Sequence, residues 1–384
     1  MFEKVLRRLR IKVIAIMHQN GRVPFFSLAT GLWVLSLAYT GVVQLRDLFI
    51  RKGYLSRSRL PCPVISVGNI TMGGTGKTPL TLHLARMILN LGYKVAIISR
   101  GYKGQYEKLG AVVSDGRSVM LDALQAGDEP FLMATHLANV PLVVGHNRYA
   151  AGCLALRRFK PDLILLDDAF QHQQLERDLD LVLLDARAPF GNHFLFPRGP
   201  LREPVSSLLR ADAIILTRCN DTMPSYLSRL VEAMQPRPVF RAFHHTFVRR
   251  IVRAGCIPAR EQNALAAQNT ADPLAGRILF AFCGLGRNSA FYDTVRLMGG
   301  HLVGTLDFDD HHPYSPLDMS RIIQAAGQAG ADCLVTTEKD FVRIPWLNPL
   351  PLDMAIMDME MDFAADQDRW DRFITNQLLA LVKP

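Results

Sequence analysis

Cysteine is scarce in this sequence, and no two cysteines have the spacing of metal ligands. The 384 residues include six, with no C-x-x-C motif among them: Cys62, Cys153, Cys219, Cys256, Cys283 and Cys333. The sequence therefore predicts neither a zinc site nor a disulfide framework. The pattern is typical of reduced, half-buried cysteines in a cytosolic protein.

Signatures of nucleic-acid and guanine-nucleotide binding are also missing. Lysine-rich patches are absent, and the doublets Arg157-Arg158 and Arg249-Arg250 are most simply solvated faces. The guanine-binding motif Asn-Lys-x-Asp is absent, and residues 217–220 are a poor substitute for it. We therefore expect no nucleic-acid partner, a GTPase is disfavoured, and nothing implies an obligate protein partner.

Hydrophobic residues and positive charge are plentiful. The length predicts two domains, and 49% hydrophobic residues is ample for sizeable cores. The net charge of +9 and the pI near 9.4 indicate an acidic partner, which is a nucleic acid, an anionic membrane face or a phosphorylated substrate. Composition alone does not choose among the three.

The first 45 residues combine basic and apolar character. A basic amphipathic segment places six apolar residues on one helical face: Phe2, Val5, Leu6, Leu9, Val13 and Ile16. Residues 23–45 then form a run of 23 residues without a charge. About 20 apolar residues are enough to span a bilayer.

A cleaved signal peptide is disfavoured for this segment because the run is too long and lacks an A-x-A site. Three other interpretations stay open. A spanning helix fits the length, but basic residues on both flanks give it no orientation. A helix pair lying in the cytoplasmic interface accounts for both flanks. A buried helix of a soluble domain fits the residues that dilute the run: Ser27, Gly31, Ser36 and Gly41.

From residue 61 onward, apolar strand-like runs alternate with helical stretches. Runs of this kind end near residues 99, 144, 166, 184 and 217. This repetition predicts a doubly wound α/β sheet, in which ligands bind at the carboxyl ends of the strands. A second, smaller α/β unit is expected after a linker at residues 255–276. The expected boundaries are 1–54 for the N-terminal helices, 55–235 for the first α/β domain and 236–384 for the second.

Residues 64–79 are predicted to form a buried strand, a glycine-rich turn and a helix start. Glycines let backbone amides approach phosphate oxygens closely. Lys77 would then face the β- and γ-phosphates, and the Thr78 hydroxyl would ligate Mg²⁺. An ordinary strand-to-helix turn is the alternative. The predicted nucleotide-binding residues are Thr71, Met72, Gly73, Gly74, Thr75, Gly76, Lys77 and Thr78.

Carboxylates follow the strand expected at residues 163–166. Asp167 and Asp168 have the form of a Walker B pair, whose aspartate holds magnesium directly or through water. A pair of helix-capping aspartates is the alternative. Another strand end is expected near Gly127-Asp128-Glu129-Pro130, which adds two carboxylates within reach of the phosphates.

These motifs, in this order, resemble those of the tetraacyldisaccharide 4'-kinase family, which makes lipid A. The resemblance covers nearly the whole chain and involves residues 68–79, 99–102, 127–130, 167–172, 190–192, 197–204, 308–311 and 336–340. It implies a P-loop NTPase-like, doubly wound, mostly parallel sheet with a smaller C-terminal α/β domain and an N-terminal membrane-associated segment. ATP and Mg²⁺ are the implied cofactors.

The resemblance implies transfer of the ATP γ-phosphoryl group to the 4'-hydroxyl of a tetraacyldisaccharide 1-phosphate at the cytoplasmic face of the inner membrane. The catalytic residues it implies are Asp128 as base, His311 as its partner, and Lys77. It assigns Asp168 to the metal together with Thr78, and Glu129 more weakly. Closure of two domains would bring Asp128 and His311 together.

The remaining assignments concern the acceptor and the departures from the family. Asn192, Arg202 and Glu203 are the predicted acceptor-side residues. The family usually has glycine, glycine and alanine where this chain has Ala169, His193 and Arg198. His193 and Arg198 lie in the expected lipid-substrate loop, so they bear on acceptor choice.

Other chemistries fit single features of the sequence. The run Asp309-Asp310-His311-His312 is a candidate second metal site or a polar turn. A membrane-surface P-loop ATPase or switch would hydrolyse nucleotide without a sugar acceptor. A structural module with a degenerate loop is disfavoured by the intact Gly76-Lys77-Thr78.

Overall fold

The structure is a computed structural model that describes residues 12–17, 19, 27–219, 225–256, 273–286, 288–344 and 349–382. Most of the predicted basic amphipathic segment lies outside the described residues. The same is true of the central part of the predicted linker at 255–276.

Within the described residues, eight strands form the first part of a long sheet. They are parallel except for the third, which pairs antiparallel at the edge. Their bounds are β1 (Val64–Asn69), β2 (Val95–Ser99), β3 (Ala111–Ser114), β4 (Leu142–Val144), β5 (Leu163–Asp167), β6 (Leu179–Asp185), β7 (Ala213–Thr217) and β8 (Val239–Val252).

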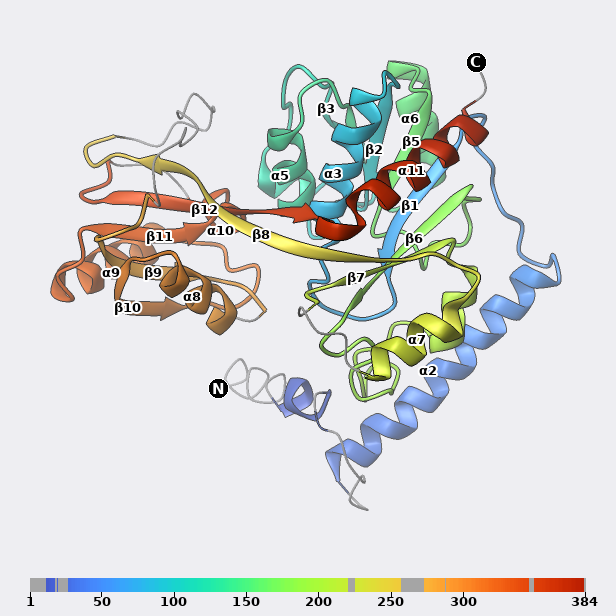
Figure 1. Ribbon diagram of the computed structural model, residues 1–384, viewed down its shortest axis with the longest axis horizontal. Coiled ribbons are helices and arrows are strands. Elements are labelled where there is room, and N and C mark those ends of the chain that lie inside the picture. Colours follow the sequence, from blue (N-terminus) through green and yellow to red (C-terminus); the bar gives the residue numbers. More distant parts are fainter. Residues whose placement is uncertain are drawn as a thin grey trace.

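Four further strands continue the same sheet: β9 (Ile278–Cys283), β10 (His301–Asp307), β11 (Cys333–Thr337) and β12 (Asp353–Asp362). The full order is β10-β9-β11-β12-β8-β7-β6-β1-β5-β2-β4-β3 (Figure 1). The predicted doubly wound, mostly parallel sheet with a smaller C-terminal α/β part is therefore confirmed.

Helices cover both faces of the first part of the sheet. Their bounds are α3 (Lys77–Asn90), α4 (Ala123–Ala126), α5 (Asp128–His136), α6 (Arg148–Phe159), α7 (Ser225–Met234) and α11 (Gln367–Leu381). Helices α3, α5 and α11 share one core cluster, whereas α6 and α7 belong to clusters on the opposite face. The smaller part carries α8 (Asn288–Leu297), α9 (Pro316–Gln328) and α10 (Glu338–Phe341), and short 3₁₀ helices span Val205–Arg210 and Ala364–Asp366.

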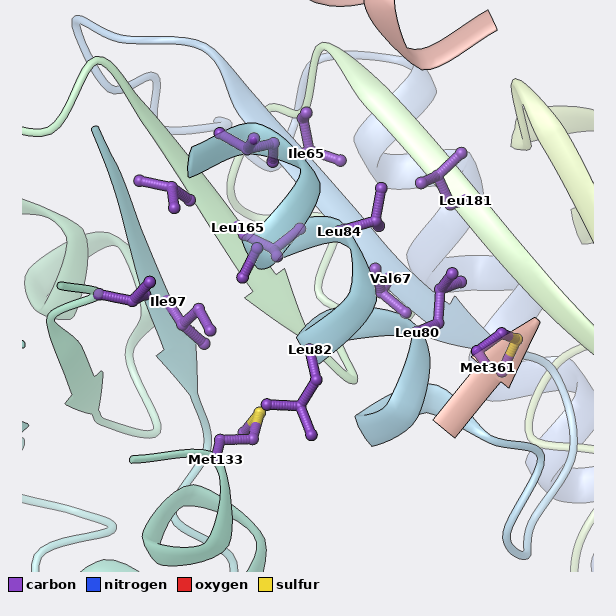
Figure 2. Close-up of a cluster of buried hydrophobic side chains, with 14 of the residues drawn as sticks. Ile65, Val67, Leu80, Leu82, Leu84, Ile97, Met133, Leu165, Leu181 and Met361 are labelled. Atoms are coloured by element: carbon purple, nitrogen blue, oxygen red, sulfur yellow. The ribbon is translucent and has the colours of Figure 1, made fainter. Parts of the chain in front are cut away.

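The central strands are apolar on both faces because both faces are covered. Leu163 of β5 packs in the cluster beneath α3, and its neighbour Ile164 packs in the cluster beneath α6. Successive side chains of a strand point to opposite faces, so a doubly covered strand becomes a continuous apolar run. Figure 2 shows Leu80 and Leu84 of α3 beside Val67 of β1.

A two-stranded ribbon connects the two parts of the sheet. Strand β8 pairs parallel with β7 over residues 239–242 and antiparallel with β12 over residues 243–252 (Figure 1). After β12, helix α11 returns to the first part, where Trp370 and Ile374 are fully buried in the cluster beneath α3. The boundaries expected at residues 54 and 235 stay a prediction.

A long helix, α2 (Leu28–Arg51), lies outside the sheet, against loops of the first part of the protein (Figure 1). It is the one described helix long and apolar enough to cross a membrane, yet only 22% of its apolar window is buried. That fraction is low for the core helix of a soluble domain. The Ser36 hydroxyl donates to the Leu195 carbonyl, and the Tyr39 hydroxyl donates to the Arg202 carbonyl. One side of α2 therefore packs on the protein, and the other leaves apolar side chains exposed.

Candidate active site

The glycine-rich loop joins β1 to α3, as the sequence predicts. Gly73 and Gly76 have φ angles of 112° and 94°, in the left-handed region that favours glycine. A Cβ atom on Gly76 would lie 2.5 Å from Nε2 of His244, so a side chain there would collide. Lys77 and Thr78 follow as the first residues of α3, where free N–H groups point at the loop.

Hydrogen bonds from neighbouring strands hold this loop in place. Asn69 donates from Nδ2 to the buried hydroxyl of Thr75 at 3.0 Å. The Thr217 hydroxyl donates to the Thr75 carbonyl at 3.0 Å, and Arg218 Nη2 donates to the Gly74 carbonyl at 2.6 Å. The loop is thus preorganised by the ends of β1 and β7.

A second segment fastens the start of the loop. The Met72 amide donates to the Pro200 carbonyl at 2.7 Å, and Thr71 forms an isolated bridge with Leu201. The Arg202 amide donates to the carbonyl of the residue after β1 at 2.7 Å. The spacing of the glycines does not predict these hydrogen bonds, which place Arg202 beside the phosphate-binding loop.

Asp168 lies between two cations. Its Oδ1 is 3.7 Å from Lys77 Nζ, and Arg202 Nη1 donates to both of its carboxylate oxygens at 3.0 and 3.1 Å. Burial raises the pKa of Asp168, but Lys77 and Arg202 outweigh that effect and hold the pKa below its usual range. The carboxylate is therefore ionised beside the loop lysine.

The resemblance assigns the metal to Asp168, whereas its neighbour Asp167 is the last residue of β5. It is buried, and it accepts hydrogen bonds from Ser99 Oγ at 3.1 Å and Thr81 Oγ1 at 3.3 Å. Burial, together with the charges of Glu129 and Asp168, raises the pKa of Asp167 to about 7. Its position as the last residue of a predicted strand, at the sheet edge where ligands bind, is the sequence feature that points to Asp167 as a site residue.

These side chains suit a magnesium ion that is completed by phosphate oxygens. Mg²⁺ is usually held by one or two carboxylates, water and substrate phosphates. The charges of Glu129 and Asp168 both act on Asp167, and the Thr78 hydroxyl lies in the first turn of α3; a divalent cation would offset this accumulation of negative charge. No group of three His, Cys, Asp or Glu side chains within the described ranges is arranged to hold a metal by itself.

The candidate second metal site at residues 309–312 has other partners. His311 contacts Asp128, and His312 Nε2 lies 3.1 Å from Asp318 Oδ2. Both contacts are polar pairings between protein groups. The alternative of a polar turn before Pro313 agrees with them.

Asp128 and His311 meet across the two parts of the sheet. His311 Nδ1 lies 2.9 Å from Asp128 Oδ2, so the predicted juxtaposition is present. Asp128 starts α5, whereas His311 follows β10 with a φ of 63°. Burial raises the pKa of Asp128, but His311 and Arg343 outweigh it and hold the pKa below its usual range. Asp128 is therefore an ionised carboxylate at neutral pH.

The segment around Asp128 corrects one expectation about local structure. Gly127 does not end a strand: it lies between α4 and α5 with a φ of 90°, and Asp128 begins a helix. Two acidic residues in the first turn of α5 suit the positive end of the helix dipole. Glu129 Oε1 lies 3.4 Å from Lys339 Nζ on α10, so both acidic residues reach the smaller part of the protein.

The predicted acceptor-side residues differ in their surroundings. Arg202 contacts Asp168, as described above. Glu203 is fully buried and pairs with Arg46 of α2 and with Arg210. Asn192 is buried in its loop, where Nδ2 donates to the Arg198 carbonyl at 3.1 Å. Contact with an acceptor stays a prediction for all three.

The departures from the family pattern have local explanations. Ala169 is fully buried behind the Asp167-Asp168 pair. His193 has a φ of 66°, a conformation in which glycine carries no strain, so the usual glycine is understandable there. Arg198 is buried, lies over the Phe194 ring at 4.8 Å and donates to the Ile16 carbonyl at 2.7 Å. It therefore ties the N-terminal segment to this loop.

Comparisons with known proteins agree with the site. A family model described as tetraacyldisaccharide-1-P 4'-kinase matches residues 28–379. A tetraacyldisaccharide 4'-kinase of Desulfatibacillum aliphaticivorans is 38% identical over 347 residues, covering 90% of this chain and 91% of the relative. One of Geobacter metallireducens is 41% identical over 334 residues, covering 85% and 93%. A crystal structure of LpxK from Aquifex aeolicus in complex with ATP is 28% identical, with a TM-score of 0.71 and coverage of 91% and 99%.

Proposed function

Since the chain belongs to the tetraacyldisaccharide 4'-kinase family, we propose that it transfers the γ-phosphoryl group of ATP to the 4'-hydroxyl of a tetraacyldisaccharide 1-phosphate. One observation carries the proposal. Asp128 carries an ionised carboxylate on α5, and the charge of the neighbouring Glu129 raises the pKa of Asp167 at the end of β5. A base is thus available beside a phosphate-binding loop, and a nucleotide switch has no need of one.

The phosphate side of the site supplies charge and positioning. Phosphoryl transfer depends mainly on these two effects. Lys77 neutralises the β- and γ-phosphates, and the loop amides fix their orientation. Thr78 and Asp168 would hold Mg²⁺, with Glu129 as a weaker candidate. The bound ion would neutralise charge that develops on the transferred group.

The acceptor side of the site supplies a base. A sugar hydroxyl is a poor nucleophile, and its proton moves to the Asp128 carboxylate as the oxygen attacks the γ-phosphorus. The bond from the γ-phosphorus to the β–γ bridging oxygen breaks, and ADP leaves with that electron pair. His311 holds Asp128 from the opposite part of the sheet. General-base help of this kind contributes about a hundredfold or more. The two parts already hold this pair together in the structure, and an opening about the β8–β12 ribbon would separate His311 from Asp128.

The segment that includes Arg202 is the proposed acceptor-binding region. Arg202 reaches Asp168 beside the loop, so it is in position to meet the transferred phosphate or the acceptor. Glu203 and Asn192 would contribute through the shape of this segment. Glu203 is braced by Arg46, which connects acceptor binding to α2.

We propose that α2 lies in the anionic cytoplasmic surface of the inner membrane. A lipid with four acyl chains barely leaves the bilayer, so the enzyme must work at the interface. The contacts of Ser36, Tyr39 and Arg46 run along one side of α2, and apolar residues cover the other. This arrangement suits a helix that lies flat, with basic residues near anionic headgroups.

Acceptor dependence of ATP turnover tests the proposal against a switch. ADP release is measured in detergent micelles with and without tetraacyldisaccharide 1-phosphate. A kinase releases ADP in step with phosphorylated lipid and stops when EDTA removes Mg²⁺. Equal turnover without the acceptor, and no lipid product with it, would favour an ATPase or switch.

A further inference from the structure

Arg343 contacts both members of the Asp128–His311 pair. It follows α10, three residues after Asp340, and was not singled out by the sequence motifs. Arg343 Nε donates to Asp128 Oδ2 at 2.8 Å, and Nη2 lies 3.1 Å from His311 Nδ1. One planar guanidinium therefore spans the proposed base and its partner.

The contacts on Asp128 converge on one oxygen. His311 Nδ1 and Arg343 Nε both reach Oδ2, at 2.9 and 2.8 Å. Among the described residues, Oδ1 has no hydrogen-bond partner. With the imidazole proton of His311 on Nδ1, both contacts donate to Oδ2, which fixes the rotation of the carboxylate and leaves the other oxygen for a substrate hydroxyl.

A buried carboxylate anchors Arg343. Asp340 is fully buried and accepts from the Gly284 amide, the Tyr314 hydroxyl and the Thr337 hydroxyl. Arg343 Nη1 lies 3.4 Å from the same Asp340 carboxylate. The guanidinium is thus anchored in the core of the smaller part of the protein, and it contacts Asp128 from there.

Arg343 is more enclosed than His311. The Arg343 side chain is 4% exposed, whereas that of His311 is 21% exposed and lies on a turn with a left-handed backbone. We propose that Arg343 is the positioning residue for the acceptor-side base. It fixes Asp128 Oδ2 so that Oδ1 faces the 4'-hydroxyl, an inference that rests on the proposed kinase function.

A general structural tie between the two parts does not explain these contacts. Lys339 already joins Glu129, and His136 at the other end of α5 lies 2.8 Å from Asp358 on β12. The β8–β12 ribbon connects the parts covalently and by strand pairing. The two parts are therefore joined without Arg343. Its distinct contribution is a second hydrogen-bond donor to the Asp128 carboxylate.

A double-mutant cycle tests the proposal through Asp128. Transfer of labelled γ-phosphate from ATP to tetraacyldisaccharide 1-phosphate is measured in micelles for wild type, R343Q, D128N and the double variant. We expect R343Q to lower kcat about tenfold or more, with the KM for ATP within about twofold. In the D128N background, the same change should cost less than about threefold, because Arg343 acts through Asp128.

Two further variants keep the result interpretable. R343K retains the charge without the forked geometry, so it should recover only part of the lost kcat. If circular dichroism shows that R343Q is unfolded, R343K replaces it in the double-mutant cycle. Its loss of kcat is then compared between the wild-type and D128N backgrounds. R296Q removes an exposed arginine that pairs with Asp293 and should match wild type.

The outcomes separate the two proposals. A kcat of R343Q within twofold of wild type, or an equal loss in both backgrounds, overturns the role of Arg343 while the kinase function stands. A wild-type protein that makes no phosphorylated lipid overturns the kinase function, and the role of Arg343 with it.

Discussion

His311 Nδ1 lies 2.9 Å from Asp128 Oδ2, although 183 positions separate the two residues in the chain. The contact joins the first turn of α5 to the turn after β10, so it depends on how the two parts of the sheet are arranged. A catalytic pair built this way is complete only when both parts are in place. That dependence would couple acceptor chemistry to closure.

Replacing His311 should impair transfer more than nucleotide binding. His311→Gln removes the imidazole that holds Asp128, so kcat should fall about tenfold to a hundredfold. ATP affinity, measured by equilibrium binding, should stay within about twofold because the P-loop is untouched. His301→Gln, at an exposed position on β10, serves as the control and should behave as wild type. A variant with normal kcat would remove His311 from the mechanism.

Glu203→Gln should destabilise the fold. It removes the fully buried carboxylate that pairs with Arg46 and Arg210, and leaves Asp47 as their remaining counter-charge. Removing one partner of a buried ion pair costs about 3–5 kcal/mol in the free energy of unfolding. Urea denaturation measures this cost, and Glu176→Gln, which breaks an exposed pair with Arg59, should cost at most about 1 kcal/mol. Similar losses in both variants would contradict a buried structural role for Glu203.

His244 should make stability depend on pH between about 6.5 and 4. Burial, with Arg218 nearby, lowers the pKa of His244 to about 4. Above pH 6.5 the folded and unfolded states both hold a neutral ring. As pH falls towards 4, only the unfolded state gains a proton, so the free energy of unfolding falls by at most about 3 kcal/mol. Below pH 4 the loss is complete.

The variant His244→Phe isolates this contribution. The free energy of unfolding is measured by urea denaturation at several pH values for both proteins. The variant should lose less stability than wild type between pH 6.5 and 4, although His172, whose pKa is also lowered to about 4, keeps its own contribution. Parallel pH curves for the two proteins would show that His244 is protonated equally in both states.

The exposed apolar side of α2 should control membrane binding. Leu35 and Val42 are 59% and 66% exposed, and each apolar side chain of this size buried in the interface contributes roughly 1.5–3 kcal/mol. Leu35→Glu with Val42→Glu should lower co-sedimentation with anionic vesicles at least tenfold. Leu297→Glu, at an 87% exposed position outside α2, is the matched control. Unchanged vesicle binding by the α2 variant would exclude this side as the membrane surface.

Local patterns predicted much of the fold because buried parallel strands leave a clear signal. Apolar runs such as 163–166 end at the sheet edge where the P-loop and the acids lie, and the structure has them there. The glycine loop is visible in the sequence because positions 73 and 76 need backbone angles that other residues avoid, and glycine stands at both. Each of these features depends on a few residues that are neighbours in the chain, so it can be predicted from the sequence.

Contacts between distant segments were not visible in the same way. Arg343 reaches Asp128 only because α10 packs near α5, and no periodic pattern encodes that approach. The pairing of β8 with β12, and the return of α11 to the first core, likewise depend on tertiary structure. The partnership of Asp128 and His311 came from the family resemblance, and their geometry came from the fold.

The most direct test of the account is transfer of labelled γ-phosphate from ATP to tetraacyldisaccharide 1-phosphate by wild type and Asp128→Asn. Asp293→Asn, which changes an exposed carboxylate, is the control. We expect phosphorylated lipid from wild type and from the control, and a loss of about a hundredfold or more in Asp128→Asn with ATP binding retained. Transfer by Asp128→Asn at the wild-type rate would contradict the assignment of the base, and no lipid product from wild type would contradict the kinase itself.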